Sequence, residues 1–157
     1  MESNSDSPGV YIPPPLFYAV IFLVAFFIQK IVVINDSLFH SNIAKIVGVS
    51  LFVIALLFLV TSLRTFFKSK NTLMLIRPAS SLQITGIYHI SRNPMYVGLA
   101  IVYLGIACFI GNWWHLILFP LLLLFVQAFI IHREEKYLFR RFGQEYLDYK
   151  AKVRRWL

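Results

Sequence analysis

The chain has 157 residues, 59% of them hydrophobic, and its mean hydropathy is +0.71. This composition is too apolar for a soluble domain of that length, so we exclude a soluble fold and predict that lipid supplies most of the solvent. The formal net charge of +8 is typical of nucleic-acid binding, but the placement of the charges, described below, indicates a membrane and no nucleic-acid partner.

Residues 1–15 differ in composition from the rest of the chain. They combine Ser, Asn, Asp and Gly with a proline run at 13–15, a composition that disfavours a helix. We predict a flexible lead-in over residues 1–15, within a single membrane-embedded domain of residues 1–157. No Lys or Arg precedes the first apolar segment and no small-residue cleavage site follows it, so we expect a retained helix and not a secretory signal.

Four apolar segments follow, each long enough or nearly long enough to cross a bilayer. A spanning helix needs ~20 apolar residues, because each residue advances ~1.5 Å through a hydrocarbon layer ~30 Å thick. The segments are residues 17–34, 43–63, 95–110 and 113–131. Only Gly111 and Asn112 separate the last two, so we predict that they form a tight helical hairpin. The predicted fold is an all-α membrane protein with four transmembrane helices.

The basic residues gather on one side of these segments. Of the 15 Lys and Arg, five lie within residues 64–92 and eight within 133–155, whereas the connection 35–42 has none. By the positive-inside rule both basic stretches are cytoplasmic. Four crossings then place both termini in the cytoplasm, at the inner membrane if the protein is bacterial. The basic excess is a topology signal first and a contact with anionic lipid second.

Beyond the fourth apolar segment the pattern becomes amphipathic. Five apolar side chains recur at steps of three or four on one helical face: Leu138, Phe142, Tyr146, Tyr149 and Val153. Gly143 weakens such a helix by ~1 kcal/mol relative to alanine and is a candidate break point. We predict a C-terminal cytoplasmic amphipathic helix that either continues the fourth helix or bends away from it.

Two polar clusters lie at the same end of the predicted hairpin. The first opens the third helix and contains Ser91, Arg92, Asn93, Pro94, Tyr96 and Gly98. The second closes the fourth helix and contains His132, Arg133, Glu134 and Glu135. Because the two helices form a hairpin, the clusters must be neighbours in space, with Arg92 beside Glu134.

The first cluster has a structural and a functional interpretation. Asn93 is a favourable N-cap and Pro94 suits the first helical position, which is enough to explain an ordinary helix start. The functional alternative is an anion site, formed by the free amides of the helix N-terminus and the donors of Arg92. Gly98 would let another backbone or a flat ligand come close.

The second cluster is either a charged helix end or part of a binding site. Paired carboxylates near the membrane, as at Glu134 and Glu135, are costly unless a positive group partners them. A ligand cation, Arg92 and Arg133 are the candidates, whereas His132 fits a helix end more readily than a ligand position. Together the clusters predict a pocket with an anion-binding end and a carboxylate end. S-adenosylmethionine fits these charges, since it carries a carboxylate, an ammonium and a sulfonium.

These clusters resemble the signature of the isoprenylcysteine carboxyl methyltransferases and the related membrane phospholipid methyltransferases. The matching residues, all within the region 82–157, are Leu82, Thr85, Gly86, Tyr88, Ser91, Arg92, Asn93, Pro94, Tyr96, Gly98, Glu134, Glu135, Leu138, Phe142, Gly143, Tyr146, Tyr149 and Val153. Two positions depart from the family pattern. Asn93 replaces the commonest histidine, and Ile130 replaces an arginine of the prenylcysteine enzymes.

The resemblance implies methyl transfer from the cofactor S-adenosylmethionine to a lipophilic or small acceptor at the cytosolic membrane face. Arg92 and Glu134 match positions implicated in arranging acceptor and cofactor, and are the catalytic residues we predict. The implied cofactor-binding residues are Tyr88, Arg92, Asn93, Pro94, Tyr96, Gly98, His132, Glu134 and Glu135. We predict no metal site, since the lone Cys108 excludes one based on cysteines.

Two other interpretations stay open at this point. One is an NADPH-binding protein similar to the sterol reductases, which are much longer. The other is a small four-helix transporter or scaffold, although a transporter predicts a charge inside a span and the helix interiors hold none. The sequence names neither the acceptor, which is a carboxylate, a thiol or an amine, nor the oligomeric state.

Overall fold

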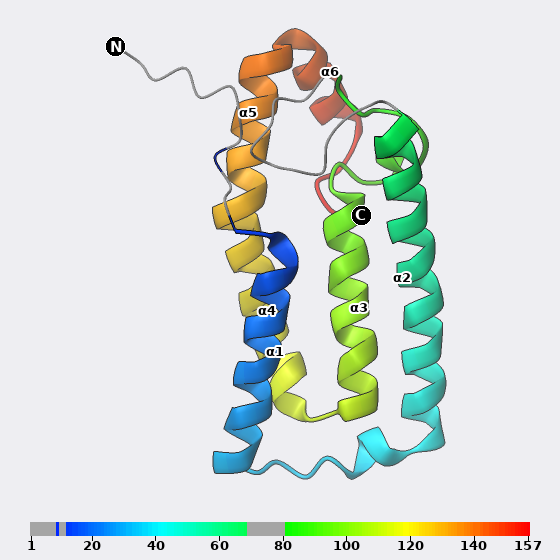
Figure 1. Ribbon diagram of the computed structural model, residues 1–157, viewed down its shortest axis with the longest axis vertical. Coiled ribbons are helices and arrows are strands. Elements are labelled where there is room, and N and C mark those ends of the chain that lie inside the picture. The colour runs from blue at the N-terminus through cyan, green and yellow to red at the C-terminus, as the bar shows by residue number, and fades with distance from the viewer. Residues whose placement is uncertain (1–8, 10–11, 69–80) are drawn as a thin grey trace.

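All regular structure in the described residues, 9, 12–68 and 81–157, is helical in this computed structural model. The elements are α1 (Pro14–Ile31), η1 (Ser37–His40), α2 (Asn42–Lys68), η2 (Gly86–His89), α3 (Pro94–Ile110), α4 (Trp113–Val126), η3 (Gln127–Ile131), α5 (His132–Phe142) and α6 (Gln144–Lys152). Figure 1 shows α1 to α4 as a bundle, with α5 extending α4 beyond the bundle and α6 folding back over its end.

Three helices of the described part are long and apolar enough to cross a membrane: Pro14–Ile31, Asn42–Thr65 and the continuous helix Trp113–Phe142. In each of the first two, only 11% of the apolar window is buried inside the protein. Most of their side chains therefore need the apolar surroundings that lipid provides, and the chain is membrane-associated. The remaining helix α3 has 17 residues, so the fourth predicted span, like the cytoplasmic placement of the termini, stays a prediction.

The flexible lead-in predicted for residues 1–15 falls largely outside the described residues. Helix α1 begins at Pro14, so the end of that segment belongs to the helix. Proline is accepted in a first helical turn, because the N–H it lacks would have no partner there.

The turn between α3 and α4 has the predicted length, but the packing differs from a tight pair. Gly111 and Asn112 connect two helices that run in opposite directions (Figure 1), whereas α3 packs chiefly on α2 and α4 chiefly on α1. The cause is small residues on α3: a Cβ at Gly98 would lie 2.7 Å from Leu59 Cδ2. Because glycine has no side chain at this position, α2 packs closer to α3 than α4 does.

The main core joins α1, α3, α4 and η3. It contains Tyr18, Tyr96, Ala100, Tyr103, Leu122, Val126, Ile130 and Ile131. Its tyrosine hydroxyls have partners across helices: Tyr18 donates to the carbonyl of Tyr96 at 3.2 Å and Tyr103 to the carbonyl of His115 at 3.1 Å. These bonds satisfy buried polar groups and tie α1 to α3 and α3 to α4.

The helix that closes the bundle is not a regular α-helix. Its middle segment η3 is a π-helical turn, which inserts one residue and so rotates everything beyond it by ~100° about the axis. Further along, Gly143 has φ +54 and separates α5 from α6. The predicted break point is therefore confirmed, since this conformation favours glycine.

The amphipathic face predicted from sequence packs against protein. Tyr146, Tyr149 and Val153 form a second cluster with Tyr88 of η2, and Leu82, Ile84, Ile87, Leu138 and Phe142 pack around it. The hydroxyl of Tyr149 donates to the carbonyl of Tyr88 at 2.7 Å. Helix α6 is thereby held over the start of α3.

Candidate functional site

The start of α3 is built from side chains that bind the C-terminal segment. Asn93 precedes the helix but its side chain caps nothing; its Nδ2 donates to the carbonyl of Arg155 at 2.9 Å. The Ser91 hydroxyl donates to the same carbonyl at 3.3 Å, and the Arg92 amide donates to the carbonyl of Arg154 at 2.9 Å. The predicted side-chain cap at Asn93 is therefore wrong, because this amide group is used to dock the C-terminal segment.

Glu135 is held by two arginines. Arg92 Nη2 lies 3.1 Å from Glu135 Oε1, and these side chains are 8% and 9% exposed. Arg155 donates from Nε to Oε1 at 2.9 Å and from Nη2 to Oε2 at 2.7 Å, the two-pronged geometry that gives the strongest pairs. This bond raises the pKa of Arg155. Two cations share one carboxylate, which leaves a net positive charge in a largely buried place.

Beside this group lie buried polar atoms that have no hydrogen-bond partner among the residues that the structure describes. They are Nε and Nη1 of Arg92 and the hydroxyl of Tyr146. Tyr146 is 2% exposed, burial raises its pKa to about 12, and the charges of Glu135 and Arg92 both act on it. Buried polar groups are rarely left unpaired, since each costs ~1–3 kcal/mol. Their concentration next to surplus positive charge indicates a binding site for an anion.

Glu134 lies in a different environment from its neighbour. Its Oε1 accepts a hydrogen bond from the Tyr96 hydroxyl at 2.5 Å. Among the described residues Glu134 has no cationic partner in an ion pair. The structure thus divides the paired carboxylates: Glu135 pairs with two arginines, whereas Glu134 accepts from a tyrosine hydroxyl.

The prediction that the two polar clusters are neighbours is confirmed by the contacts of Arg92 with Glu135 and of Tyr96 with Glu134. The expected partner of Arg92 was Glu134, and the structure places Glu135 there. Consecutive helical residues point ~100° apart, so only one of the two carboxylates can face Arg92. His132, also a predicted cofactor-binding residue, is exposed and stands apart from these contacts.

Three residues of the site were not predicted as such. Arg155 was counted within the basic stretch that signals topology, and Tyr146 within the apolar face of the amphipathic helix. The third, Trp156, donates to Gln127 Oε1 of the π-helical turn at 2.9 Å. The one sequence signal was that Tyr146 carries a hydroxyl at a position where an apolar side chain is enough for packing.

Gly98 serves the packing of helices. Because its missing Cβ would lie 2.7 Å from Leu59 Cδ2, Gly98→Val should lower the free energy of unfolding by ~1–3 kcal/mol, measured by thermal denaturation in detergent. Gly105→Ala, whose Cβ would lie 3.3 Å from the Phe52 ring, should lose less. Unchanged stability of Gly98→Val with weakened ligand binding would instead place Gly98 at the ligand.

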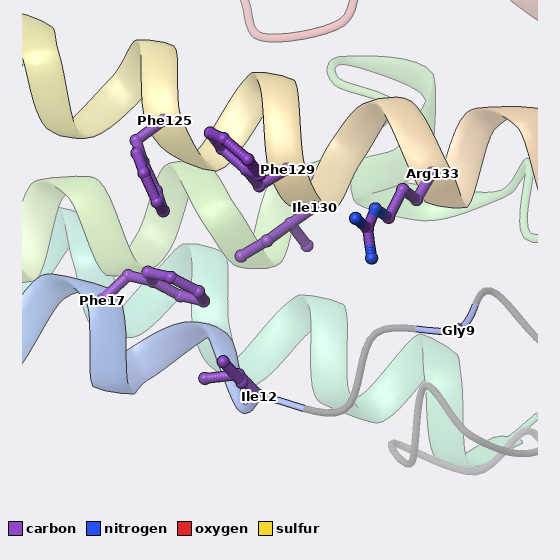
Figure 2. Close-up of a pocket in the computed structure, with 7 residues that line it drawn as sticks. All are labelled: Gly9, Ile12, Phe17, Phe125, Phe129, Ile130 and Arg133. Atoms are coloured by element: carbon purple, nitrogen blue, oxygen red, sulfur yellow. The ribbon is translucent and has the colours of Figure 1, made fainter.

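A cavity of about 320 Å³ lies near the site, but not between Arg92 and Glu134 as the sequence suggested. It lies between α1 on one side and α4 with η3 on the other. Figure 2 shows Phe17 facing Phe125 and Phe129 across it, with the Arg133 guanidinium at one end.

Comparison with known proteins matches this region to a family. A family model described as phospholipid methyltransferase matches residues 43–145. Over 66 residues the chain is 44% identical to an uncharacterised protein of Haemophilus influenzae, an alignment that covers 40% of this chain and 100% of that protein. No solved structure matches the chain. The family match includes both polar clusters and ends just before Tyr146, so Tyr146 and Arg155 lie beyond it.

Proposed function

The chain belongs to the phospholipid methyltransferase family, and on this premise we propose that it transfers a methyl group from S-adenosylmethionine to a lipophilic or small acceptor at the membrane surface. The observation that carries the proposal is the buried Arg92 side chain. Its Nη2 pairs with Glu135, whereas its Nε and Nη1 have no partner within the described ranges 12–68 and 81–157. Membership of a methyltransferase family and an anion site at Arg92 both fit S-adenosylmethionine as the cofactor.

The residues present fit S-adenosylmethionine by charge. The free donors of Arg92 and the Tyr146 hydroxyl would hold its carboxylate, and they lie in a site with surplus positive charge. Its two cationic groups would be stabilised by a nearby carboxylate, and Glu134 forms no ion pair with any described residue. When bound, S-adenosylmethionine supplies a methyl carbon activated by the positive sulfur next to it.

The task of the protein is then to position an acceptor and keep water out. Tyr96 fixes Glu134 by its hydrogen bond and is itself fixed by Tyr18, which donates to its carbonyl. Such pre-organisation is worth several kcal/mol when reacting atoms are held at ~3–3.5 Å. An amine acceptor must lose a proton, which Glu134 would take directly or through water, whereas a carboxylate or thiolate acceptor needs no base.

The experiment that tests the proposal is transfer of radiolabelled methyl from S-adenosylmethionine into total lipid and small-molecule extracts by the purified protein. Glu134→Gln and Arg92→Ala serve as site variants, and equal label in all three proteins would remove the site assignment. Titration with S-adenosylhomocysteine and with NADPH separates the alternatives. A reductase-like protein binds NADPH, whereas a transporter or scaffold binds neither.

Two tyrosine variants on α6 should behave in opposite ways. Tyr146→Phe removes a hydroxyl that has no partner in the described part of the protein. It should therefore leave stability unchanged and weaken S-adenosylhomocysteine binding about tenfold, the equivalent of one lost hydrogen bond of ~1.4 kcal/mol. Tyr149→Phe removes the donor to the buried carbonyl of Tyr88, so it should cost ~1–3 kcal/mol of stability and leave the affinity unchanged.

Titration calorimetry and thermal denaturation in the same detergent check both halves of this comparison. If Tyr146→Phe lowers stability and spares the affinity, its hydroxyl has a structural partner and Tyr146 does not contact the cofactor.

A further inference from the structure

The cavity between α1 and α4 has apolar walls and one charged end. Its walls include Ile12, Phe17, Phe125, Phe129 and Ile130, and Arg133 lies at the end nearest α5. In Figure 2 the aromatic rings from the two sides face one another, and the Arg133 guanidinium points toward the side of the cavity where Ile12 and Gly9 lie. A ligand that matches both parts has an apolar body and a polar group at one end.

The charge of Arg133 is available to such a ligand. The Arg133 side chain is exposed and takes part in none of the ion pairs among the described residues. The nearest carboxylate along the chain, Glu134, is directed to Tyr96 instead. The charged end of the cavity is therefore positive and favours an anionic group.

The size and position of the cavity narrow the class of ligand. Its volume of about 320 Å³ is at the lower end of the ~300–1,000 Å³ usual for small-molecule sites, which gives room for one apolar chain. Phe125 and Phe129 at its edge are 39% and 49% exposed, on the outside of the candidate membrane span Trp113–Phe142. A single-chain amphiphile can enter from the bilayer through this edge.

The cavity lies next to the helical turn that carries the proposed catalytic group. Ile130 lines the cavity and precedes Glu134 by four residues, one turn of the helix. On the other wall Phe17 is followed by Tyr18, whose hydroxyl bonds the backbone of the Tyr96 that holds Glu134. The cavity is therefore lined by residues adjacent in the chain to Glu134 and to Tyr18.

We propose that this cavity binds the apolar chain of the methyl acceptor and that Arg133 binds an anionic group on it, so that the acceptor is a single-chain anionic amphiphile. The identification of the occupant as the acceptor rests on the proposed function. The binding of an anionic single-chain amphiphile does not.

Photolabelling tests the binding. The full chain in phosphatidylcholine nanodiscs is irradiated with dodecanoate carrying a terminal diazirine, or with dodecanol carrying the same group, and the labelled peptides are mapped by mass spectrometry. Dodecanoate should label the peptides that contain Phe17 and Phe125 to Ile130 above the lipid-facing residues of α2, and dodecanol should label them about fivefold less.

Variants of the protein distinguish the contribution of the Arg133 charge from that of the free volume of the cavity. Arg133→Gln should lower dodecanoate labelling about fivefold, Arg133→Lys should retain most of it, and Arg140→Gln, an exposed arginine on the same helix, should have no effect. Ile12→Trp, which crowds the cavity, should lower labelling by both probes. Equal labelling by acid and alcohol, or labelling of α2 as strong as that of the cavity peptides, overturns the proposal.

Failure of this inference and failure of the proposed function give different results. Labelling of the cavity in a protein that does not bind S-adenosylhomocysteine keeps the site and removes the methyltransferase role. Binding of S-adenosylhomocysteine without selective labelling does the reverse.

Discussion

Glu134→Gln is expected to lower the rate of methyl transfer at least ~100-fold at saturating substrates, with S-adenosylhomocysteine affinity within a few-fold of the original. Glutamine keeps the size of the side chain and an oxygen that accepts from Tyr96, so the geometry seen in the structure is preserved. Only the charge and the basicity are lost. Glu134 forms no ion pair among the described residues, so the substitution breaks no salt bridge.

Initial rates of radiolabelled methyl transfer check this result. Glu145→Gln is the matched control, because Glu145 is an exposed carboxylate on α6 and should leave the rate unchanged. A rate for Glu134→Gln within about threefold of the original would show that Glu134 only helps to pack α5 against α3.

Glu135→Ala is expected to lower the free energy of unfolding by ~3–5 kcal/mol, because it leaves the buried Arg92 without its counter-ion. It also releases Arg155, whose carbonyl and side chain both hold the C-terminal segment. Thermal denaturation in detergent measures the loss. Arg155→Gln should cost less, since the Arg155 side chain is 31% exposed and Arg92 still neutralises Glu135.

The two carboxylates should therefore differ: substitution of Glu134 should lower the reaction rate, and substitution of Glu135 should lower the stability. If Glu135→Ala is stable and merely fails to bind S-adenosylhomocysteine, then Glu135 belongs to the cofactor site and not to the scaffold. If Glu134→Gln is the variant that unfolds, the assignments of the two residues are reversed.

Several features of this fold could be predicted because they depend on patterns local in the chain. The apolar segments gave the helices, and the spacing of Leu138, Phe142 and Tyr146 with the glycine at 143 gave a bent amphipathic element. The meeting of the two polar clusters followed from topology alone, since a two-residue turn returns the chain to the same end of the bundle.

Other features depend on contacts that leave no mark in the sequence. Asn93 has the sequence pattern of an N-cap, but its side chain donates to the backbone carbonyl of Arg155. Every residue has a backbone carbonyl, so the sequence does not single out this partner. The choice of Glu135 over Glu134 as the partner of Arg92 depends on the rotation of α5, which the π-helical turn changes. The pairing of α3 with α2 depends on which way Gly98 faces, and no local pattern states that.

The π-helical turn Gln127–Ile131 also sets what kinds of mutation this chain can survive. Exchanging one side chain there alters a single contact, whereas losing one codon would bring the helix back into regular phase and turn everything downstream by roughly a quarter of a revolution. Glu134 would then leave Tyr96 and Glu135 would leave Arg92 in one event. Among natural variants we therefore expect substitutions in this segment to be common and insertions or deletions to be rare.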